Sequence, residues 1–160
     1  MTVQKTNVMR LLEQKKIPYR AYSYPHDGSA VDAVTVAALL ERDPATIFKT
    51  LAARASDKSC CVFVIPAGKE LDLKKAARAV GAKSVAMLHL NELTELTGYV
   101  RGGCSPIGMK KLYRTVIDES ALRQETILVS AGKIGAQVEL EPQALAGMIR
   151  ASFADLTSED

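Results

Sequence analysis

The sequence has 160 residues, the length of one ordinary domain, and its 41 Leu, Ile, Val and Phe residues suffice for a hydrophobic core. Its longest apolar run, Cys60 to Ile65, is too short to span a bilayer, and the first seven residues lack the apolar segment of a secretion signal. These features and a net charge of only +3 exclude a disordered chain, a coiled coil, a membrane protein and a secreted disulfide scaffold. We therefore expect a cytoplasmic globular protein that makes no membrane contact.

The first half of the chain alternates helical and extended patterns. Pro18 ends the first helical pattern, Thr35 is placed to cap the second, and the turn-forming segment 56–59 separates two strands. The expected helices cover residues 8–15 and 35–42, and the expected strands cover 19–24, 47–55 and 60–65.

The second half begins with an amphipathic helix over 72–80, which Gly81 ends, and continues with a shorter helix over 91–97 capped by Asn91. Residues 98–111 are rich in glycine and predict irregular structure. Strands are expected over 115–118, 126–130 and 136–140, and a last helix from Pro142 is expected to bury Leu145, Met148, Ile149 and Phe153. The whole pattern predicts one α/β domain over residues 1–160 with a mixed sheet.

Lys49 is the first residue with a chemical implication. Period-2 alternation places it on the same strand face as Ile47 and Leu51, so an ammonium group lies within an apolar stripe. Such a lysine either extends its ammonium to water at the strand end or presents a charge inside a pocket.

The second candidate is the segment from Gly98 to Gly108, which holds four glycines and a proline. Backbone N–H groups of such a loop can turn toward a bound carbonyl or oxyanion, although most glycine-rich loops are only surface loops. It is not a dinucleotide-binding motif, because Gly102 and Gly103 are adjacent and no strand-to-helix context follows.

The segment from Ser130 to Gly135 is similar to a phosphate-binding loop but fails at two positions. Ile127 stands where the first glycine of that motif belongs, and Ile134 replaces its Ser or Thr. These two positions exclude an ATPase, and a turn between two strands with Lys133 exposed remains the simpler interpretation.

Cysteine and histidine usage argues against a metal or cofactor. The odd set of three cysteines contains no C-x-x-C, and only His26 and His89 accompany it. We expect no metal site and no cofactor. Cys104, inside the glycine-rich segment, is a candidate nucleophile, but no spacing pairs it with either histidine.

Five segments in order resemble one family. They are Tyr24-Pro25-His26-Asp27, Ile47-Phe48-Lys49-Thr50-Leu51, residues 71–77 with 81–83, the glycine-rich segment 98–108, and Ser130 to Gly135. This set, which spans almost the whole chain, is similar to the YbaK/EbsC group of aminoacyl-tRNA deacylases, relatives of the editing domain of bacterial prolyl-tRNA synthetases. The resemblance implies a mixed, mostly antiparallel sheet that forms a distorted barrel wrapped by helices.

The resemblance also implies a free-standing hydrolase that clears mischarged tRNA. The expected substrate is aminoacyl-tRNA, Cys-tRNA(Pro) foremost, and prolyl-tRNA synthetase is the expected partner protein. The family's essential lysine matches Lys49, and the amides of Gly102 and Gly103 are expected to act with it. The expected substrate contacts are Tyr24, Thr50, Cys104, Ser105, Pro106, Gly108, Gly132, Lys133 and Gln137.

Two positions depart from the family pattern. Ile134 stands where family loops commonly carry arginine, and Gln137 stands where one branch carries aspartate. The first change removes a phosphate contact, so specificity for the amino acid and the tRNA does not transfer directly.

The charge distribution fits a polyanionic substrate. Up to Arg114 the chain has 18 basic and 10 acidic residues, whereas the remainder has 3 basic and 8 acidic ones. The residues expected to contact phosphates of the acceptor stem are Lys74, Lys75, Arg78, Lys83, Lys110, Lys111 and Arg114. A solvated helix face explains those on helix 72–80 equally well.

The implied mechanism needs no protein nucleophile, because an aminoacyl ester is already activated and a cysteinyl substrate brings its own thiol. Two alternatives stay open at this point. One is a tRNA- or protein-binding module without activity on the same fold, and the other is a hydrolase that uses Cys104.

Overall fold

The computed structural model describes residues 4–158; residues 1–3 and 159–160, which the predicted domain 1–160 includes, lie outside the described part. Within residues 4–158 the chain forms eight strands, five α-helices and two short 3-10 helices. Four of the six strand pairs in this part are antiparallel, so the expected mixed, mostly antiparallel α/β fold is confirmed. Residues 4–158 also contain no helix with the length and apolar character needed to cross a bilayer.

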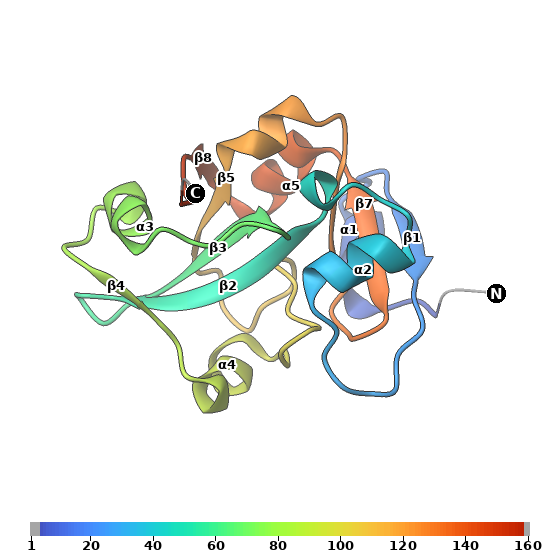
Figure 1. Cartoon of the computed structure of the whole chain (residues 1–160), viewed down its shortest axis with the longest axis horizontal. Coiled ribbons are helices and arrows are strands. Elements are labelled where there is room, and N and C mark those ends of the chain that lie inside the picture. Colours follow the sequence, from blue (N-terminus) through green and yellow to red (C-terminus); the bar gives the residue numbers. More distant parts are fainter. Residues whose placement is uncertain (1–3, 159–160) are drawn as a thin grey trace.

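A five-stranded sheet forms the larger half of the molecule (Figure 1). Its strands, in spatial order, are β4 (Val85–Met87), β2 (Phe48–Ala55), β3 (Cys60–Pro66), β5 (Arg114–Asp118) and β8 (Ser152–Ala154). The predicted hairpin of β2 and β3 is confirmed, with Asp57 accepting a hydrogen bond from the Ser59 amide at 2.9 Å in the turn. The long connection from β3 to β5 lets β5 run parallel to β3.

A three-stranded antiparallel sheet forms the other half. It orders β1 (Arg20–Ser23), β7 (Ala136–Leu140) and β6 (Ile127–Ser130). An isolated parallel bridge between Ile47 and Leu128 joins it to the larger sheet. The distorted barrel therefore consists of two sheets that meet at this bridge, and α1 (Asn7–Gln14) and α5 (Pro142–Ile149) contribute to the core beneath the smaller one.

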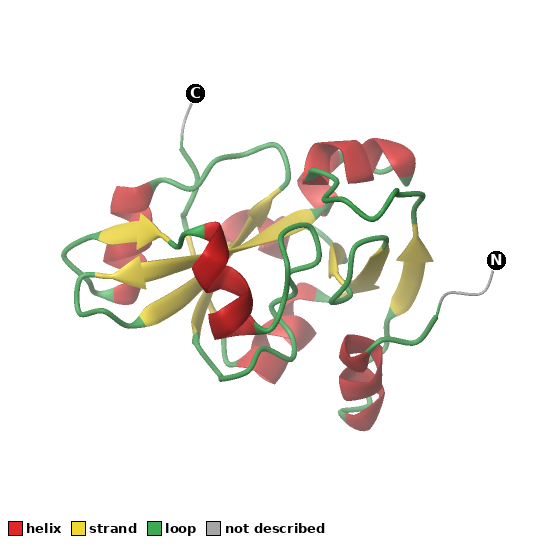
Figure 2. Cartoon of the chain, turned by 90° about the horizontal axis from the view of Figure 1, so that it is seen from below, coloured by secondary structure: helices red, strands yellow, loops and turns green. Residues whose placement is uncertain are grey.

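Two helices lie on opposite faces of the larger sheet. Helix α3 (Leu73–Val80) packs on the face that carries Ala53 and Phe63, and it ends at Gly81, as predicted. Helix α4 (Leu90–Thr97) lies across the other face, and loops gather beside it (Figure 2). Successive side chains of β2 therefore point alternately to the sheet face covered by α3 and to the sheet face covered by α4.

The predicted starts of two helices are wrong. Helix α2 (Ala33–Leu39) begins before Thr35, because the Asp32 carboxylate caps it by accepting from the Thr35 amide at 2.9 Å. Helix α4 begins before Asn91, with His89 as the capping residue. Asp32 lies three residues before Thr35 and His89 two residues before Asn91, where periodicity gives no signal. At α4 the Glu92 carboxylate closes the start of the helix by accepting from the His89 amide at 3.2 Å.

Strands β4 and β8 and the 3-10 helices Pro44–Thr46 and Glu119–Arg123 are absent from the sequence prediction, because elements of three to five residues are too short to show a period. The expectation that the last helix buries Phe153 is also wrong. Helix α5 stops at Arg150, whose φ of 55° is left-handed, and Phe153 lies in β8 opposite Ile117.

Gly147 offers a test of the helix assignment. It lies inside α5, and a Cβ built on it meets nothing within 4 Å. We expect Gly147→Ala to raise the free energy of unfolding in urea by about 0.5–1 kcal/mol, because alanine restricts the unfolded chain without a clash. A loss of stability would contradict the helical conformation of this residue.

Candidate active site

The seam between the two sheets brings the chemically distinctive side chains together. Two residues beyond the Ile47–Leu128 bridge, the parallel strands reach Lys49 and Ser130. Alternation places Lys49 on the same face as Ile47, and Ser130 on the same face as Leu128. Ser130 in turn is the cross-strand partner of Gln137, so Lys49, Ser130 and Gln137 are neighbours on this face.

Tyr24, the residue directly after β1, completes this group. It is buried in one hydrophobic cluster with Ile47 and Leu128, and its amide donates to the Gly135 carbonyl at 3.0 Å. The predicted residues Tyr24, Lys49 and Gln137 therefore lie at the same seam, beside α2, whose residues Val36 and Ala37 pack in one cluster with Tyr24. We call Tyr24, Lys49, Ser130 and Gln137 the seam site.

Two fully buried polar atoms of the seam site have no partner among the described residues. Tyr24 Oη and Gln137 Oε1 are buried and make no hydrogen bond to any residue in the described part of the chain. Buried polar atoms in proteins are nearly always bonded, so these two atoms are suited to a ligand's donors and acceptors. Thr50 Oγ1 is similarly unpartnered, and alternation places Thr50 on the opposite face of β2 from Lys49.

Lys49 is half-buried, and its ammonium makes no hydrogen bond or ion pair within residues 4–158. Burial lowers the pKa of Lys49 below its usual range, while the nearby carboxylates of Glu70 and Asp32 oppose that change. A desolvated cation without a fixed partner favours the pocket interpretation over an ammonium that simply extends to water.

The glycine-rich segment packs directly against two other loops. A Cβ on Gly102 would lie 2.9 Å from Cα and Cβ of Ala30, next to the α2 cap. A Cβ on Gly103 would lie 2.9 Å from the Ile134 amide nitrogen and 3.0 Å from the Lys133 backbone. Only glycine permits this approach, so the loops 24–32, 98–108 and 130–135 converge at the seam site.

The backbone amides of this segment are not equivalent. The Gly103 N–H donates to the Val100 carbonyl at 3.0 Å, so it is engaged within the loop. The N–H groups of Gly102 and Cys104 have no acceptor within residues 4–158. The amides on either side of Gly103 are therefore the ones available to a ligand, and Gly103 itself provides the close packing.

The rest of the glycine-rich segment is structural support. Ser105 and Pro106 are buried, and Ser105 Oγ accepts from the Ile107 amide at 3.2 Å. Gly108 has a φ of 78° and packs near Tyr99, whose hydroxyl donates to the Ile107 carbonyl. These contacts fix the shape of the segment rather than expose its side chains.

In the loop 130–135, the Gly132 amide donates to Ser130 Oγ at 3.2 Å, which leaves the serine proton free to donate. Gly132 has a φ of 96° and faces Val8 and Tyr99, so it too is a packing residue. Lys133 is exposed, with Nζ 3.3 Å from Gln4 Oε1.

Cys104 is unsuited to act as a nucleophile. Burial raises the pKa of its thiol to about 12, so almost no thiolate is present at neutral pH. Neither His26, which packs on Gly135, nor His89, which caps α4, forms a hydrogen bond with it among the described residues. Residues 4–158 also hold no group of three His, Cys, Asp or Glu side chains suited to a metal ion.

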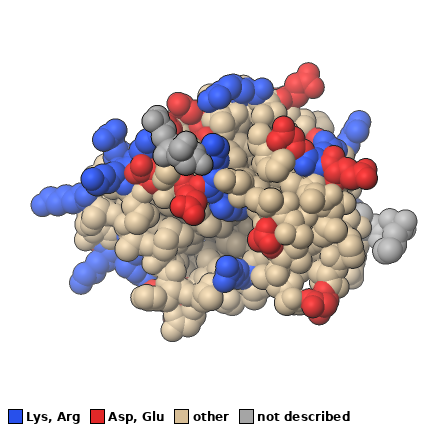
Figure 3. Space-filling model, viewed as in Figure 1, with Lys and Arg blue, Asp and Glu red and all other residues tan. Residues whose placement is uncertain are grey.

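Basic side chains gather over the end of the molecule formed by α3, β4 and the β2–β3 turn, while acidic ones are more frequent over the half with α2 and β7 (Figure 3). Three of the expected phosphate contacts have partners in the chain. Lys75 bonds to Asp155 and the Thr157 carbonyl, Lys110 to the Glu95 carbonyl, and Arg114 to the Val80 carbonyl.

Comparison with known proteins identifies the family of this chain. The aminoacyl-tRNA editing domain family matches residues 27–148. The chain belongs to this family. A protein of Enterococcus faecalis, EbsC, is 46% identical over 99% of this chain and 97% of its own length. Its name assigns it provisionally as a Cys-tRNA(Pro)/Cys-tRNA(Cys) deacylase. The family expected from the five sequence segments is thus confirmed.

Two solved structures share the fold of this editing domain. Hypothetical protein APE2540 superposes with a TM-score of 0.86 at 25% identity, covering 96% of this chain and 100% of that one. A structure described as a candidate trans-editing enzyme for prolyl-tRNA synthetase gives a TM-score of 0.83 at 24% identity, covering 98% and 100%. At 24% identity, the similarity to this second structure supports the shared fold alone.

Sequence reasoning overlooked Ser130 of the seam site and Asp32 beside it. Ser130 lies at the end of a predicted strand, and its position opposite Gln137 depends on a pairing that the sequence does not reveal. Asp32 is hidden because the apolar stripe favours Thr35, which lies closer to it, as the capping residue. An Asp three residues before a Thr, at the start of an apolar stripe, is the signal that could have found the cap.

Proposed function

We propose that this editing domain hydrolyses the ester bond of mischarged aminoacyl-tRNA, with Cys-tRNA(Pro) as its principal substrate. The observation that carries the proposal is the half-buried, unpaired ammonium of Lys49 beside the unpartnered polar atoms of Tyr24 and Gln137. This arrangement suits a small polar aminoacyl group and the ribose that bears it. The 46% identity to EbsC over the full chain supports the same substrate class.

The reaction proceeds through the substrate's own thiol. Its sulfur attacks the cysteinyl carbonyl carbon, a carbon–sulfur bond forms, and the bond to the ribose oxygen breaks. The thiol proton passes to the leaving ribose oxygen, and the four-membered thiolactone then opens with water to free cysteine. Lys49 orients the ester and stabilises charge on the departing oxygen, and the Gly102 and Cys104 amides bind the carbonyl oxygen.

We also propose that residues 1–160 act as one free-standing domain in the cytoplasm, where charged tRNA is made and used. Phosphate contacts carry little sequence information, so selection of tRNA(Pro) requires a second determinant. A complex with prolyl-tRNA synthetase would supply it, because that enzyme already holds the same tRNA.

The deciding experiment compares hydrolysis of Cys-tRNA(Pro) with that of Ser-tRNA(Pro). The two esters differ by one atom, so only a mechanism through the substrate thiol separates them strongly. We expect release of cysteine at least about 100-fold faster than release of serine. Equal rates would overturn the thiol mechanism, and binding without release from any ester would indicate a binding module.

Replacing the buried thiol tests the Cys104 alternative. We expect Cys104→Ser to retain kcat/KM for Cys-tRNA(Pro) within about threefold, because the thiol is protonated and the backbone amide is unchanged. Steady-state kinetics at neutral pH measure this. Inactivation with an unchanged circular dichroism spectrum would favour the cysteine-dependent hydrolase.

Binding of tRNA is expected to weaken steeply with salt. If four phosphates are contacted, the slope of log K against log salt concentration is about −3 to −4. Fluorescence anisotropy with labelled tRNA at several KCl concentrations measures it. If the Kd for tRNA does not change with KCl concentration, the proposed phosphate contacts are not made.

A further inference from the structure

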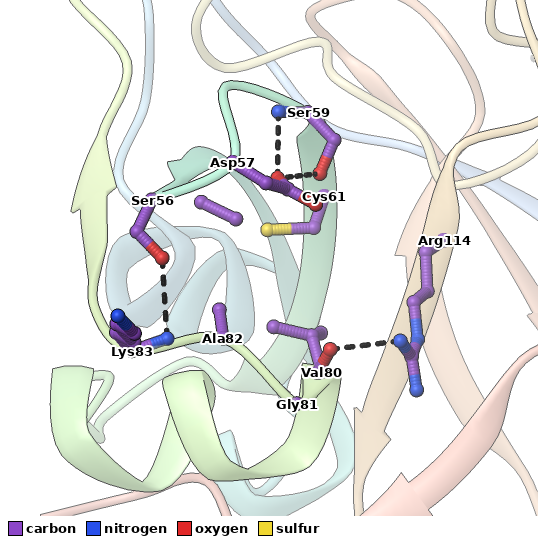
Figure 4. A pocket seen from close by; sticks show the side chains of 10 residues that line it. Ser56, Asp57, Ser59, Cys61, Val80, Gly81, Ala82, Lys83 and Arg114 are labelled. Carbon is purple, nitrogen blue, oxygen red and sulfur yellow. Dashed lines mark hydrogen bonds between the residues drawn. The ribbon is translucent and has the colours of Figure 1, made fainter.

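A cavity of about 360 Å³ lies away from the seam site, at the far end of β2. It is enclosed by the β2–β3 turn, the carboxyl end of α3 and the start of β5 (Figure 4). Its apolar lining comes from Ala55, Cys61, Val80 and Ala82, and the proposed reaction uses none of these residues.

Hydrogen-bond donors and positive charge line the rim of this cavity. Figure 4 shows Lys83 and Arg114 on opposite sides, with Ala82 between them. Arg114 Nη1 donates to the Val80 carbonyl at 2.8 Å, which fixes the guanidinium and leaves its other nitrogens available. Lys83 Nζ has no partner within residues 4–158, whereas its amide donates to Ser56 Oγ at 3.1 Å, so the Ser56 hydroxyl proton is free to donate.

The cavity also contains one carboxylate, that of Asp57. This group accepts from the Ser59 amide at 2.9 Å and from Ser59 Oγ at 2.6 Å, and these bonds hold the pKa of Asp57 below its usual range. It is therefore engaged by the turn itself. The cavity is therefore lined by two cations, Lys83 and Arg114, and by only one carboxylate. It lies at the end of the molecule where Lys and Arg side chains gather (Figure 3).

We propose that this cavity binds a phosphate group of the tRNA strand, held between Lys83 and Arg114 with a further donor from Ser56. The guanidinium supplies a planar pair of donors and the ammonium a point charge, which together suit a phosphodiester. This inference rests on the proposed function, because it takes the tRNA as the source of the phosphate.

The distance along β2 from the seam site to the cavity is compatible with this phosphate contact. Ala55 lies six positions after Lys49, and a strand advances about 3.3 Å per residue, which gives about 20 Å. A stacked nucleic acid strand rises about 3.4 Å per nucleotide, so this distance corresponds to about six nucleotides. A tRNA whose esterified end occupies the seam site would thus place a phosphate of its acceptor stem at the cavity.

The test measures tRNA binding rather than hydrolysis. Uncharged, fluorescein-labelled tRNA(Pro) is titrated with the wild-type chain, Lys83→Gln, Arg114→Gln and the control Lys15→Gln, which removes the same charge from an exposed residue after α1. At low salt we expect Kd to rise about five- to tenfold for Lys83→Gln and Arg114→Gln and less than twofold for Lys15→Gln. The salt slope should fall by about 0.7–0.9 per lost phosphate contact.

Equal Kd values for Lys83→Gln, Lys15→Gln and the wild type would overturn the proposal, whether or not the protein hydrolyses Cys-tRNA(Pro). A second arm uses inorganic phosphate and AMP, monitored by NMR shifts of the Gly81 and Lys83 amides. Sub-millimolar binding of either, with tRNA affinity unchanged in both variants, would assign the cavity to a free phosphate ligand and overturn the tRNA assignment. Failure of the proposed function appears separately, as absent hydrolysis by the wild type.

Discussion

Lys49→Met is expected to abolish deacylation and to stabilise the fold at the same time. Methionine fills the volume of the lysine stem but supplies no charge to the ester, so kcat/KM for Cys-tRNA(Pro) should fall at least about 100-fold, equivalent to about 3 kcal/mol. Stability should rise because burial disfavours the unpaired Lys49 ammonium in the folded chain. We expect the midpoint of thermal unfolding to increase by about 1–4 °C.

The matched control is Lys15→Met, which makes the same replacement at an exposed residue. It should change neither kcat/KM nor the unfolding midpoint. If Lys49→Met raises KM and leaves kcat intact, Lys49 contributes uniform substrate binding rather than stabilisation of the transition state. If the variant is less stable than the wild type, Lys49 has a structural role in the folded chain.

The stability difference between Lys49→Met and the wild type should also depend on pH. Because the pKa of Lys49 is lowered in the folded state, the unfolded chain binds more protons between the folded pKa and the ordinary value of about 10.4. Wild-type stability attributable to Lys49 therefore rises with pH through that window. We expect urea unfolding to show the advantage of Lys49→Met shrinking from neutral pH toward pH 10, and a constant advantage would contradict the burial effect.

The part of the site that alternation determines could be predicted from sequence. Lys49 interrupts an apolar strand face, and that conflict between local pattern and side-chain chemistry is visible without coordinates. Period-2 alternation also predicts the β2–β3 hairpin correctly, because both strands are long and their turn residues are distinctive. Thr50 lies on the opposite face of β2 from Lys49, so its contact with the substrate stays a prediction.

Contacts between distant segments could not be predicted. The Ile47–Leu128 bridge joins strands that are 81 positions apart, and no periodicity in either strand specifies that partner. Ser130 and the amides of the glycine-rich segment reach their positions through this bridge and through the packing of Gly103 on Lys133. The hydrogen bond from Gly103 to Val100 depends in turn on the conformation of the loop.

Gly103→Ala is expected to cause the second large loss of activity. A Cβ at this position would lie 2.9–3.0 Å from backbone atoms of Ile134 and Lys133, which cannot rotate away as a side chain does. The loop must shift, and the flanking amides of Gly102 and Cys104 then move from the carbonyl oxygen. Loss of one such donor costs about 10²–10³ in rate, so kcat should fall by at least that factor. Overpacking should lower the free energy of unfolding by about 1–3 kcal/mol.

Gly68→Ala is the control that shows whether replacing any glycine by alanine lowers activity and stability, or only replacing Gly103. A Cβ built on Gly68 meets nothing within 4 Å, so its variant should keep both the activity and the stability of the wild type. Single-turnover hydrolysis of Cys-tRNA(Pro) measures the chemical step directly, and urea unfolding measures stability. If Gly103→Ala loses stability but hydrolyses at the wild-type rate, the amides beside Gly103 do not bind the carbonyl, and the oxyanion donors must lie elsewhere in the seam site. If it is inactive while Gly68→Ala is not, the close packing of Gly103 is what holds the two amides in place.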